Sequence, residues 1–211
     1  GRTMRRVIQR DAPSIELLLL DAQGVLFNNP WAAFLEDLAQ RTDRSAEEVF
    51  RLWYDELHDD AWLGSISDTE LWTRLTGTPH GHAAWQSDLE RRFRPGRLAR
   101  FLPGWRRTVE IWVLSNHRSH WLEARLDRFG LDDHLERVLV SDALGAMKPD
   151  TRAFDAVRSA VSRPESVLFV DDQQRNVNAA AQLGFRALRA SDDPAWIDVV
   201  DDAVGGAIPV P

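Results

Sequence analysis

Uninterrupted runs of aliphatic residues mark the predicted strands of this chain. The first run is Leu17–Leu20, the second ends at Leu114 and the third ends at Val170, and amphipathic stretches of helical length separate them. Strands that are buried on both faces of a parallel sheet have this pattern, because helices cover both faces and leave no polar side. The pattern therefore predicts an α/β fold built on a parallel sheet.

Polar side chains follow each of the three runs. They are Asp21, Ser115, Asn116, Asp171 and Asp172. Because ligands of parallel sheets bind at the carboxyl ends of the strands, we expect these side chains to meet at one edge of the sheet. An acid, a hydroxyl group and an acid pair at one edge indicate a polar site.

The segment between the first run and Trp105 is too long for a simple crossover connection. Apolar residues recur at helical spacing over residues 31–56 and 67–100, which predicts helices. Two serine and glutamate pairs have the spacing of helix-capping boxes, namely Ser45 with Glu48 and Ser67 with Glu70. Tryptophans are frequent here, and we expect most of them in the core of a small helical bundle and one or two at a cleft. They are Trp31, Trp53, Trp62, Trp72 and Trp85.

These patterns predict two structural units. We expect an α/β core formed by residues 15–28 and 101–204, with a helical unit of residues 29–100 inserted into it. Residues 1–14 are polar and without a clear period, so they are expected to form an N-terminal extension. Residues 205–211 are typical of a loose C-terminal tail.

The charge balance argues against nucleic acid as a partner. The chain has 33 acidic and 26 basic residues and a formal net charge of −7, whereas phosphate backbones are bound by clustered lysine and arginine. The arginines within 91–94 and 106–107 are expected on solvated helix faces or in local ion pairs. No cysteine is present, and no apolar run approaches the roughly 20 residues of a membrane span. We therefore expect a cytoplasmic protein without a membrane segment.

Lys148 is the only lysine among the 26 basic residues. An ammonium group is a compact point charge that can contact a carboxylate and a phosphoryl oxygen together, whereas the planar guanidinium group needs more room. The lone lysine therefore indicates a site that cannot accept arginine. The alternative is an ordinary surface lysine.

Four short motifs, in order along the chain, resemble those of the haloacid dehalogenase superfamily over roughly residues 15–190. The first family motif, Asp-x-Asp-Gly-(Thr/Val)-Leu after a strand, is similar to residues 21–26 except at Gln23. The other three are matched by Ser115, by Lys148 with Pro149, and by the segment 170–184. Members of this superfamily are mostly phosphatases and phosphomutases.

The resemblance implies a fold and a reaction. It implies a Rossmann-like parallel-sheet core, an inserted helical cap that closes over the active site, and a magnesium-dependent phosphatase acting on a small phosphorylated metabolite. Asp21 would be the nucleophile and would form an aspartyl-phosphate. The ligands of Mg²⁺ would be the Asp21 side chain, the Gln23 backbone carbonyl and Asp172, with Asp171 close by. The oligomeric state is left open.

The remaining site residues follow from the same resemblance. Ser115, Asn116 and Lys148 would bind the phosphate, and Lys148 would also hold Asp21 in line. Asn176 stands where many members have another acid, so it is expected to orient the metal ligands. An alternative role for Asn176 is the N-cap of the following helix.

Gln23 is the departure from the family pattern. The acid usually found at this catalytic position protonates the leaving alcohol and later activates water, and an amide has no titratable proton for this task. General acid–base catalysis contributes about 10²- to 10⁴-fold, so we expect a slow phosphatase. Other groups could carry the proton, although each is more simply an exposed residue: His117, His120, Asp55, Glu56, His58, Asp59 and Asp60. The pair His80 and His82 is expected to lie in a turn.

Other functions compete with phosphatase activity. A non-catalytic module that binds a phosphorylated metabolite or a protein is supported by Gln23. A 2-haloacid dehalogenase has an aromatic residue at that place, uses no metal and lacks the acid pair seen at Asp171 and Asp172. Enzymes that cleave carbon–phosphorus bonds need a lysine in the cap, and none is present between residues 29 and 100. Mutases depend on the missing acid more than hydrolases do.

Overall fold

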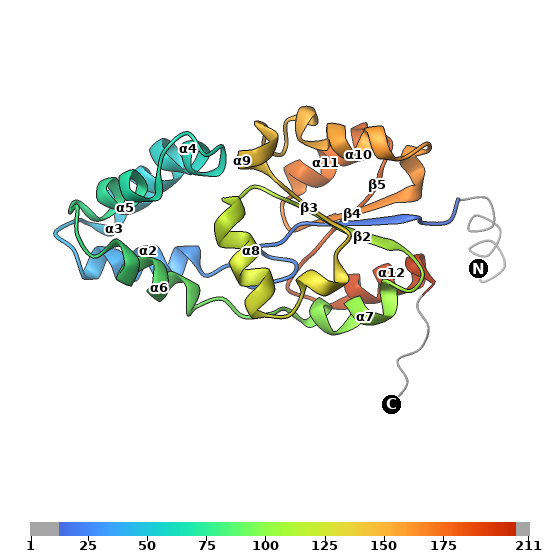
Figure 1. Cartoon of the computed structure of the whole chain (residues 1–211), viewed down its shortest axis with the longest axis horizontal. Coiled ribbons are helices and arrows are strands. Elements are labelled where there is room, and N and C mark those ends of the chain that lie inside the picture. The colour runs from blue at the N-terminus through green and yellow to red at the C-terminus, as the bar shows by residue number, and fades with distance from the viewer. Residues whose placement is uncertain (1–12, 206–211) are drawn as a thin grey trace.

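The chain folds around a single five-stranded parallel sheet (Figure 1). The structure is a computed structural model that describes residues 13–205. The predicted extension up to residue 12 and the predicted tail from residue 206 lie outside the described residues. The strand order is β3-β2-β1-β4-β5. The strands are β1 (Leu17–Leu20), β2 (Glu110–Ser115), β3 (Arg137–Val140), β4 (Val167–Asp171) and β5 (Arg186–Arg189).

Both faces of the sheet are buried under helices, as the aliphatic runs predict. Leu17 and Leu19 belong to one hydrophobic cluster, and Leu18 and Leu20 belong to the other, because successive side chains of a strand point to opposite faces. The first face packs against α10 (Asp155–Ala160) and α11 (Gln174–Gln182). The second packs against α7 (Leu102–Trp105), α8 (Ser119–Arg128) and α12 (Ala195–Val204). The predicted Rossmann-like α/β core is confirmed.

Short elements complete this core. They are α9 (Ser141–Leu144) and the 3₁₀ helices η2 (Arg97–Phe101), η3 (Asp132–His134), η4 (Thr151–Phe154) and η5 (Pro164–Ser166). In residues 13–205, no helix is long and apolar enough to cross a membrane.

Residues 31–90, which we call the helical insertion, form a separate layer beyond one end of the sheet (Figure 1). Its elements are α2 (Trp31–Gln40), α3 (Ala46–Arg51), the π-helix η1 (Leu52–Leu57), α4 (His58–Trp62), α5 (Asp68–Thr76) and α6 (His82–Glu90). Both predicted caps are present: Ser45 Oγ accepts from the Glu48 N–H, and Ser67 Oγ accepts from the Glu70 N–H, each at 3.1 Å. The predicted helices are therefore confirmed.

The two linkers of the helical insertion pair with each other. The Asn28 N–H donates to the Arg94 carbonyl at 3.1 Å, and the Gly96 N–H donates to the Leu26 carbonyl at 2.7 Å. The chain thus leaves and re-enters the core at one place. Since η2, which includes residues 97–100, directly continues into α7, we propose that the helical unit ends near residue 94 and not at the expected residue 100.

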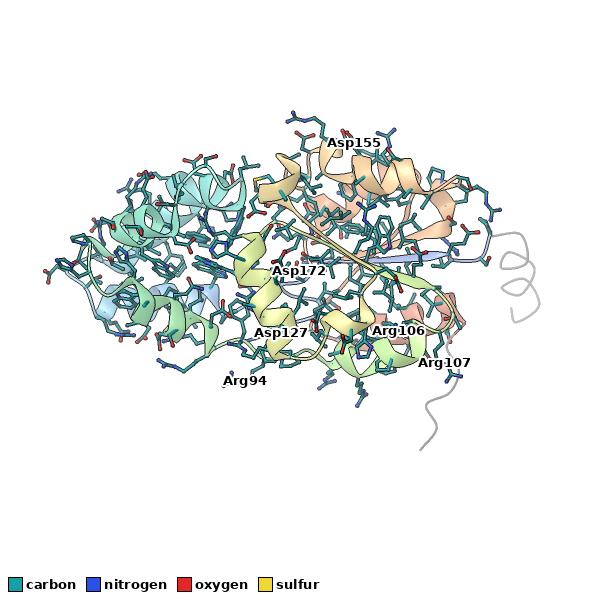
Figure 2. All side chains as sticks on the ribbon, in the orientation of Figure 1. Arg94, Arg106, Arg107, Asp127, Asp155 and Asp172 are labelled. Carbon is teal, nitrogen blue, oxygen red and sulfur yellow. The ribbon has the colours of Figure 1, made fainter. Side chains whose placement is uncertain are left out.

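The predicted surface arginines lie on the outside or in ion pairs. Arg94, Arg106 and Arg107 are exposed (Figure 2). Arg91 and Arg92 pair with Asp88 of α6, each at 3.1 Å. These arginines serve local contacts, in agreement with the expectation.

Buried polar contacts fix the helical insertion against the core. Arg125 of α8 is fully buried and donates to both carboxylate oxygens of Glu90, at 2.5 and 3.0 Å. Its guanidinium carbon lies 3.4 Å from the centre of the Phe93 ring. Arg118 is 6% exposed, and its guanidinium group donates to the Ala61 carbonyl at 3.0 Å. These contacts hold α4 and α6 beside the end of the sheet.

Substitution of Glu90 by glutamine is expected to lower the free energy of unfolding by about 3 kcal/mol, because it leaves the buried Arg125 guanidinium group without an oppositely charged partner. Urea unfolding followed by tryptophan fluorescence measures this change. Asp155→Asn is the matched control, since the Asp155–Arg158 pair is exposed on both sides and such pairs contribute about 1 kcal/mol or less. Equal effects of the two substitutions would contradict the argument.

Candidate active site

Lys148 is the centre of the polar site. It is 1% exposed, and its ammonium group donates to Asp171 Oδ2 at 2.7 Å, to the Leu114 carbonyl at 2.8 Å and to Asp21 Oδ1 at 3.0 Å. An ammonium group has three protons, so all of its donors are used. The alternative of a surface lysine is therefore wrong. Burial lowers the pKa of Lys148, but attraction from Asp171 and Asp21 outweighs it, so the pKa is raised and the group stays charged.

Asn116 holds the backbone of Lys148 in place. Its side-chain amide donates to the Lys148 carbonyl at 2.9 Å, and its Oδ1 accepts from the Lys148 N–H at 2.8 Å. Asn116 also lines the cleft described below. Ser115, at the end of β2, is 1% exposed and is not part of the cleft wall. Binding of phosphate by either residue stays a prediction.

Three carboxylates gather around this lysine, as the strand ends predict. One carboxylate oxygen from each of Asp21, Asp171 and Asp172 lies within 4.8 Å of the corresponding oxygens of the other two. Among residues 13–205, no other group of three or more metal-ligating side chains is this close. Burial raises the pKa of Asp21 well above its ordinary value, and repulsion from Asp171 adds to this effect. Burial, again with repulsion from Asp171, also raises the pKa of Asp172.

The three carboxylates differ in how many partners they have. Asp171 is fully buried; its Oδ1 accepts from the Gln173 N–H at 2.8 Å, and its Oδ2 accepts from Lys148 and from Asn176 Nδ2 at 3.1 Å. Asp172 Oδ1, in contrast, is buried and has no hydrogen-bond partner among the described residues. Asp171 therefore braces the lysine, while Asp21 and Asp172 face the cleft.

Asn176 is the third residue of α11, whose N-cap is Gln173. The alternative that Asn176 caps this helix is therefore wrong, because the helix begins earlier than the hydrophobic pattern indicated. Its side chain instead binds Asp171. A supporting role behind the acidic cluster stays a prediction, and this contact is compatible with it.

Gly24 brings the first loop close to Asp172. Its φ is +86°, in the left-handed region that favours glycine, and a side-chain carbon at this position would lie 2.3 Å from Asp172 Oδ2. Gln23, next to it, donates from Nε2 to Asn29 Oδ1 at 3.1 Å, and its Oε1 is buried without a partner in the described chain. Gln23 also lines the cleft beside Asp21 and Asp172, although its amide cannot titrate.

A cleft opens between this cluster and the helical insertion. Asp172 lies at the end of the sheet that faces the insertion (Figure 2). On the insertion side, the wall is aromatic: the rings of Trp31 and Trp53 stack with centres 4.1 Å apart, and Trp62 meets the Trp53 ring edge-on. Three of the five tryptophans therefore line the cleft, more than the expected one or two. The wall also includes four residues that the sequence did not single out: Asn29, Tyr54, Gln173 and Arg175.

Of the seven alternative proton carriers, only His58 lines the cleft. His117 is fully buried against Trp62 and Arg125, and burial, together with the Arg125 charge, keeps its pKa well below the ordinary value. His120 is exposed and pairs with Asp68 at 2.7 Å. The acidic candidates Asp55, Glu56, Asp59 and Asp60 are exposed and outside the cleft wall. His80 lies in a bend before α6, as expected of a turn, and His82 begins that helix.

The structure is that of an α/β protein with a polar site at the carboxyl edge of its parallel sheet. In this site a buried lysine lies within an acidic cluster, under an aromatic wall. The chain belongs to the family of haloacid dehalogenase-like hydrolases, whose sequence model matches residues 15–184. The resemblance indicated by the four motifs is thus confirmed.

Three known proteins illustrate the similarity. The phosphatase MT3486 of Mycobacterium tuberculosis is 30% identical over 198 residues, which cover 82% of this chain and 86% of that protein. The GMP/IMP nucleotidase YrfG of Escherichia coli is 39% identical over 75 residues, so the match spans 35% of this chain and only 34% of the nucleotidase. The HAD family enzyme bt-2542 of Bacteroides thetaiotaomicron, in complex with magnesium and inorganic phosphate, has a TM-score of 0.72 at 22% identity, covering 85% of this chain and 97% of that one.

Proposed function

We propose that this hydrolase is a magnesium-dependent phosphatase that acts on a small phosphorylated metabolite. The observation that carries the proposal is the charge balance of the site. Three buried or half-buried carboxylates surround one ammonium group, which leaves two negative charges without compensation when all groups are ionised. Buried charges require partners, and one divalent cation would balance the cluster.

The donor set fits magnesium. Mg²⁺ prefers oxygen ligands and is commonly held by one or two carboxylates, and the Oδ1 of Asp172, which has no hydrogen-bond partner among the described residues, would be such a ligand. Asp21, Asp172 and the Gln23 backbone carbonyl would hold the ion, with Asp171 bracing Lys148 beside it. When bound, the ion neutralises the nucleophile and the phosphate, which would otherwise repel each other.

The protein's own groups would carry out the covalent chemistry. Asp21 Oδ1 is fixed by Lys148 and by the Ala22 N–H at 2.9 Å, so its carboxylate is held in one orientation for attack on phosphorus. Attack would form an aspartyl-phosphate and release the alcohol, and water would then hydrolyse this intermediate. Because the three Lys148 protons are already donated, its ammonium group would act during both steps by holding Asp21 and by placing a positive charge beside the phosphoryl group.

Release of inorganic phosphate tests this proposal. The substrates are p-nitrophenyl phosphate and a panel that includes GMP, IMP and sugar phosphates, chosen because the similar proteins are named as phosphatases and nucleotidases. We expect turnover with Mg²⁺ and less than about 1% of it with excess EDTA, since the loss of the ion removes charge stabilisation of several kcal/mol. Release of halide from 2-chloropropionate without metal would overturn the proposal.

Gln23 favours a second candidate, a module that binds phosphorylated metabolites without turnover. Its amide cannot perform the acid–base step of this family. Tight binding of phosphate esters in calorimetry, without release of phosphate over hours, would support this candidate over the phosphatase.

A further inference from the structure

We propose that His58 of the helical insertion performs the acid–base step that Gln23 cannot perform. The inference rests on the proposed phosphatase function. It assigns to His58 the protonation of the leaving alcohol and the later activation of water.

The position of His58 is the first argument. It lines the same cleft as Asp21, Lys148 and Asp172. The other groups on the insertion side of that cleft are less suited to proton transfer, because Trp31, Trp53 and Trp62 do not titrate, and burial raises the pKa of Tyr54 above its ordinary value. An imidazole is the side chain that most readily gains and loses a proton near neutral pH.

The hydrogen bond of His58 is the second argument. Its Nδ1 lies 2.8 Å from Asp59 Oδ1. An ionised carboxylate only accepts hydrogen bonds, so Nδ1 carries a proton and Nε2 is the nitrogen that exchanges one. In the described part of the chain, Nε2 has no hydrogen-bond partner. A carboxylate that fixes the tautomer of a catalytic histidine is a recurring arrangement in hydrolases.

The π-helix η1 explains why this histidine reaches the cleft. In a π-helix, backbone hydrogen bonds join residue i to residue i+5, so Trp53 and His58, which are five residues apart, lie on the same side of the helix. In an α-helix the same spacing would place them on different sides. The imidazole is enclosed by Trp53, at a ring-centre distance of 5.6 Å, and by Trp62, at 5.9 Å. Single turns of π-helix are frequent at functional sites.

Titratable and charged groups face His58 from both sides of the cleft. Asp59 is next to it on α4, and Tyr54 comes from η1. Across the cleft, the core contributes Asp21, Lys148, Asp172 and Arg175. Three carboxylates thus oppose two cations around His58.

In each cycle His58 donates one proton to the leaving oxygen and regains one from water. As Asp21 attacks phosphorus, the bond from phosphorus to the ester oxygen breaks, and that oxygen takes the Nε2 proton of His58 and leaves as an alcohol. The neutral imidazole then removes a proton from water while the water oxygen attacks the phosphorus of the aspartyl-phosphate. The bond from phosphorus to Asp21 breaks, inorganic phosphate leaves, and both Asp21 and His58 return to their starting states.

The test compares two esters in the His58→Gln variant, with Mg²⁺ present. Nitrophenolate leaves without a proton, whereas the alkoxide of glycerol 2-phosphate needs one. We expect kcat/KM, which covers the steps up to release of the alcohol, to fall by about 10²- to 10⁴-fold on glycerol 2-phosphate and by less than about tenfold on p-nitrophenyl phosphate. His120→Gln is the matched control, because His120 also pairs with a carboxylate but lies outside the cleft, and it should change neither rate.

A second variant separates chemistry from structure. Gln23→Asp supplies the missing acid, so in this background His58→Gln should cost less than about tenfold on glycerol 2-phosphate. Equal losses of kcat/KM on both esters, no loss on glycerol 2-phosphate, or a loss that Gln23→Asp does not reduce would overturn the role of His58. Wild-type protein that hydrolyses only the nitrophenyl ester would also overturn it. Hydrolysis of neither ester would instead overturn the proposed phosphatase function.

Discussion

Replacement of Lys148 by arginine is expected to lower kcat by about 10²- to 10³-fold, the usual cost of losing a positioned donor at a reacting oxyanion, although the charge is kept. The ammonium group is buried and contacts two carboxylates and a backbone carbonyl within 3.0 Å. The guanidinium group is larger and planar, so it cannot make these contacts without moving Asp21 or Asp171. Phosphate release from p-nitrophenyl phosphate measures the effect.

The control for this substitution is the reverse exchange at an exposed ion pair. Arg152 pairs with Asp150 at 2.7 Å, and the Arg152 side chain is 72% exposed. Arg152→Lys should therefore leave kcat unchanged within about twofold, since exposed pairs contribute little. Full activity of Lys148→Arg would show that this position needs only a positive charge and would contradict the assignment of a point charge between two acids.

Substitution of Asp21 by asparagine is expected to reduce kcat by about 10⁴-fold or more, because an amide cannot replace the attacking carboxylate. The same change should not weaken the fold. It removes one of three neighbouring acids, and burial together with repulsion from Asp171 raises the pKa of Asp21. In metal-free buffer, the melting temperature of the variant should equal or exceed that of the wild-type protein.

The two measurements together distinguish a catalytic group from a structural one. Asp127, exposed on α8 (Figure 2), provides the control variant Asp127→Asn, which should change neither kcat nor the melting temperature. A lower melting temperature for Asp21→Asn would indicate that Asp21 stabilises the site as a partner of Lys148. Activity retained above about 1% would exclude Asp21 as the nucleophile.

The sequence predicted the centre of the sheet better than its edges. The strands β1, β2 and β4 are aliphatic and buried, so their runs are visible in the sequence. The edge strands β3 and β5 contain arginines at their ends and are partly exposed. An edge strand has a neighbouring strand on one side only and is less buried, so its sequence shows a weaker hydrophobic pattern.

The polar site was predictable to the extent that strand ends determine it. Parallel strands bring Asp21, Asp171 and Asp172 together, and this convergence follows from topology alone. The opposite wall could not be predicted, because the placement of the helical insertion depends on contacts between distant residues, such as that of Arg118 with Ala61. The π-helix that places Tyr54 and His58 at the cleft also has no simple signature in the sequence.

The burial of the only lysine has a practical consequence for labelling. The folded protein offers no ε-amine to solvent, so amine-reactive dyes, cross-linkers and acylating reagents have no lysine to modify under native conditions. Modification of Lys148, measured by mass spectrometry as a single mass shift within its peptide, would therefore report directly on the fraction of molecules in which the environment of this lysine has opened.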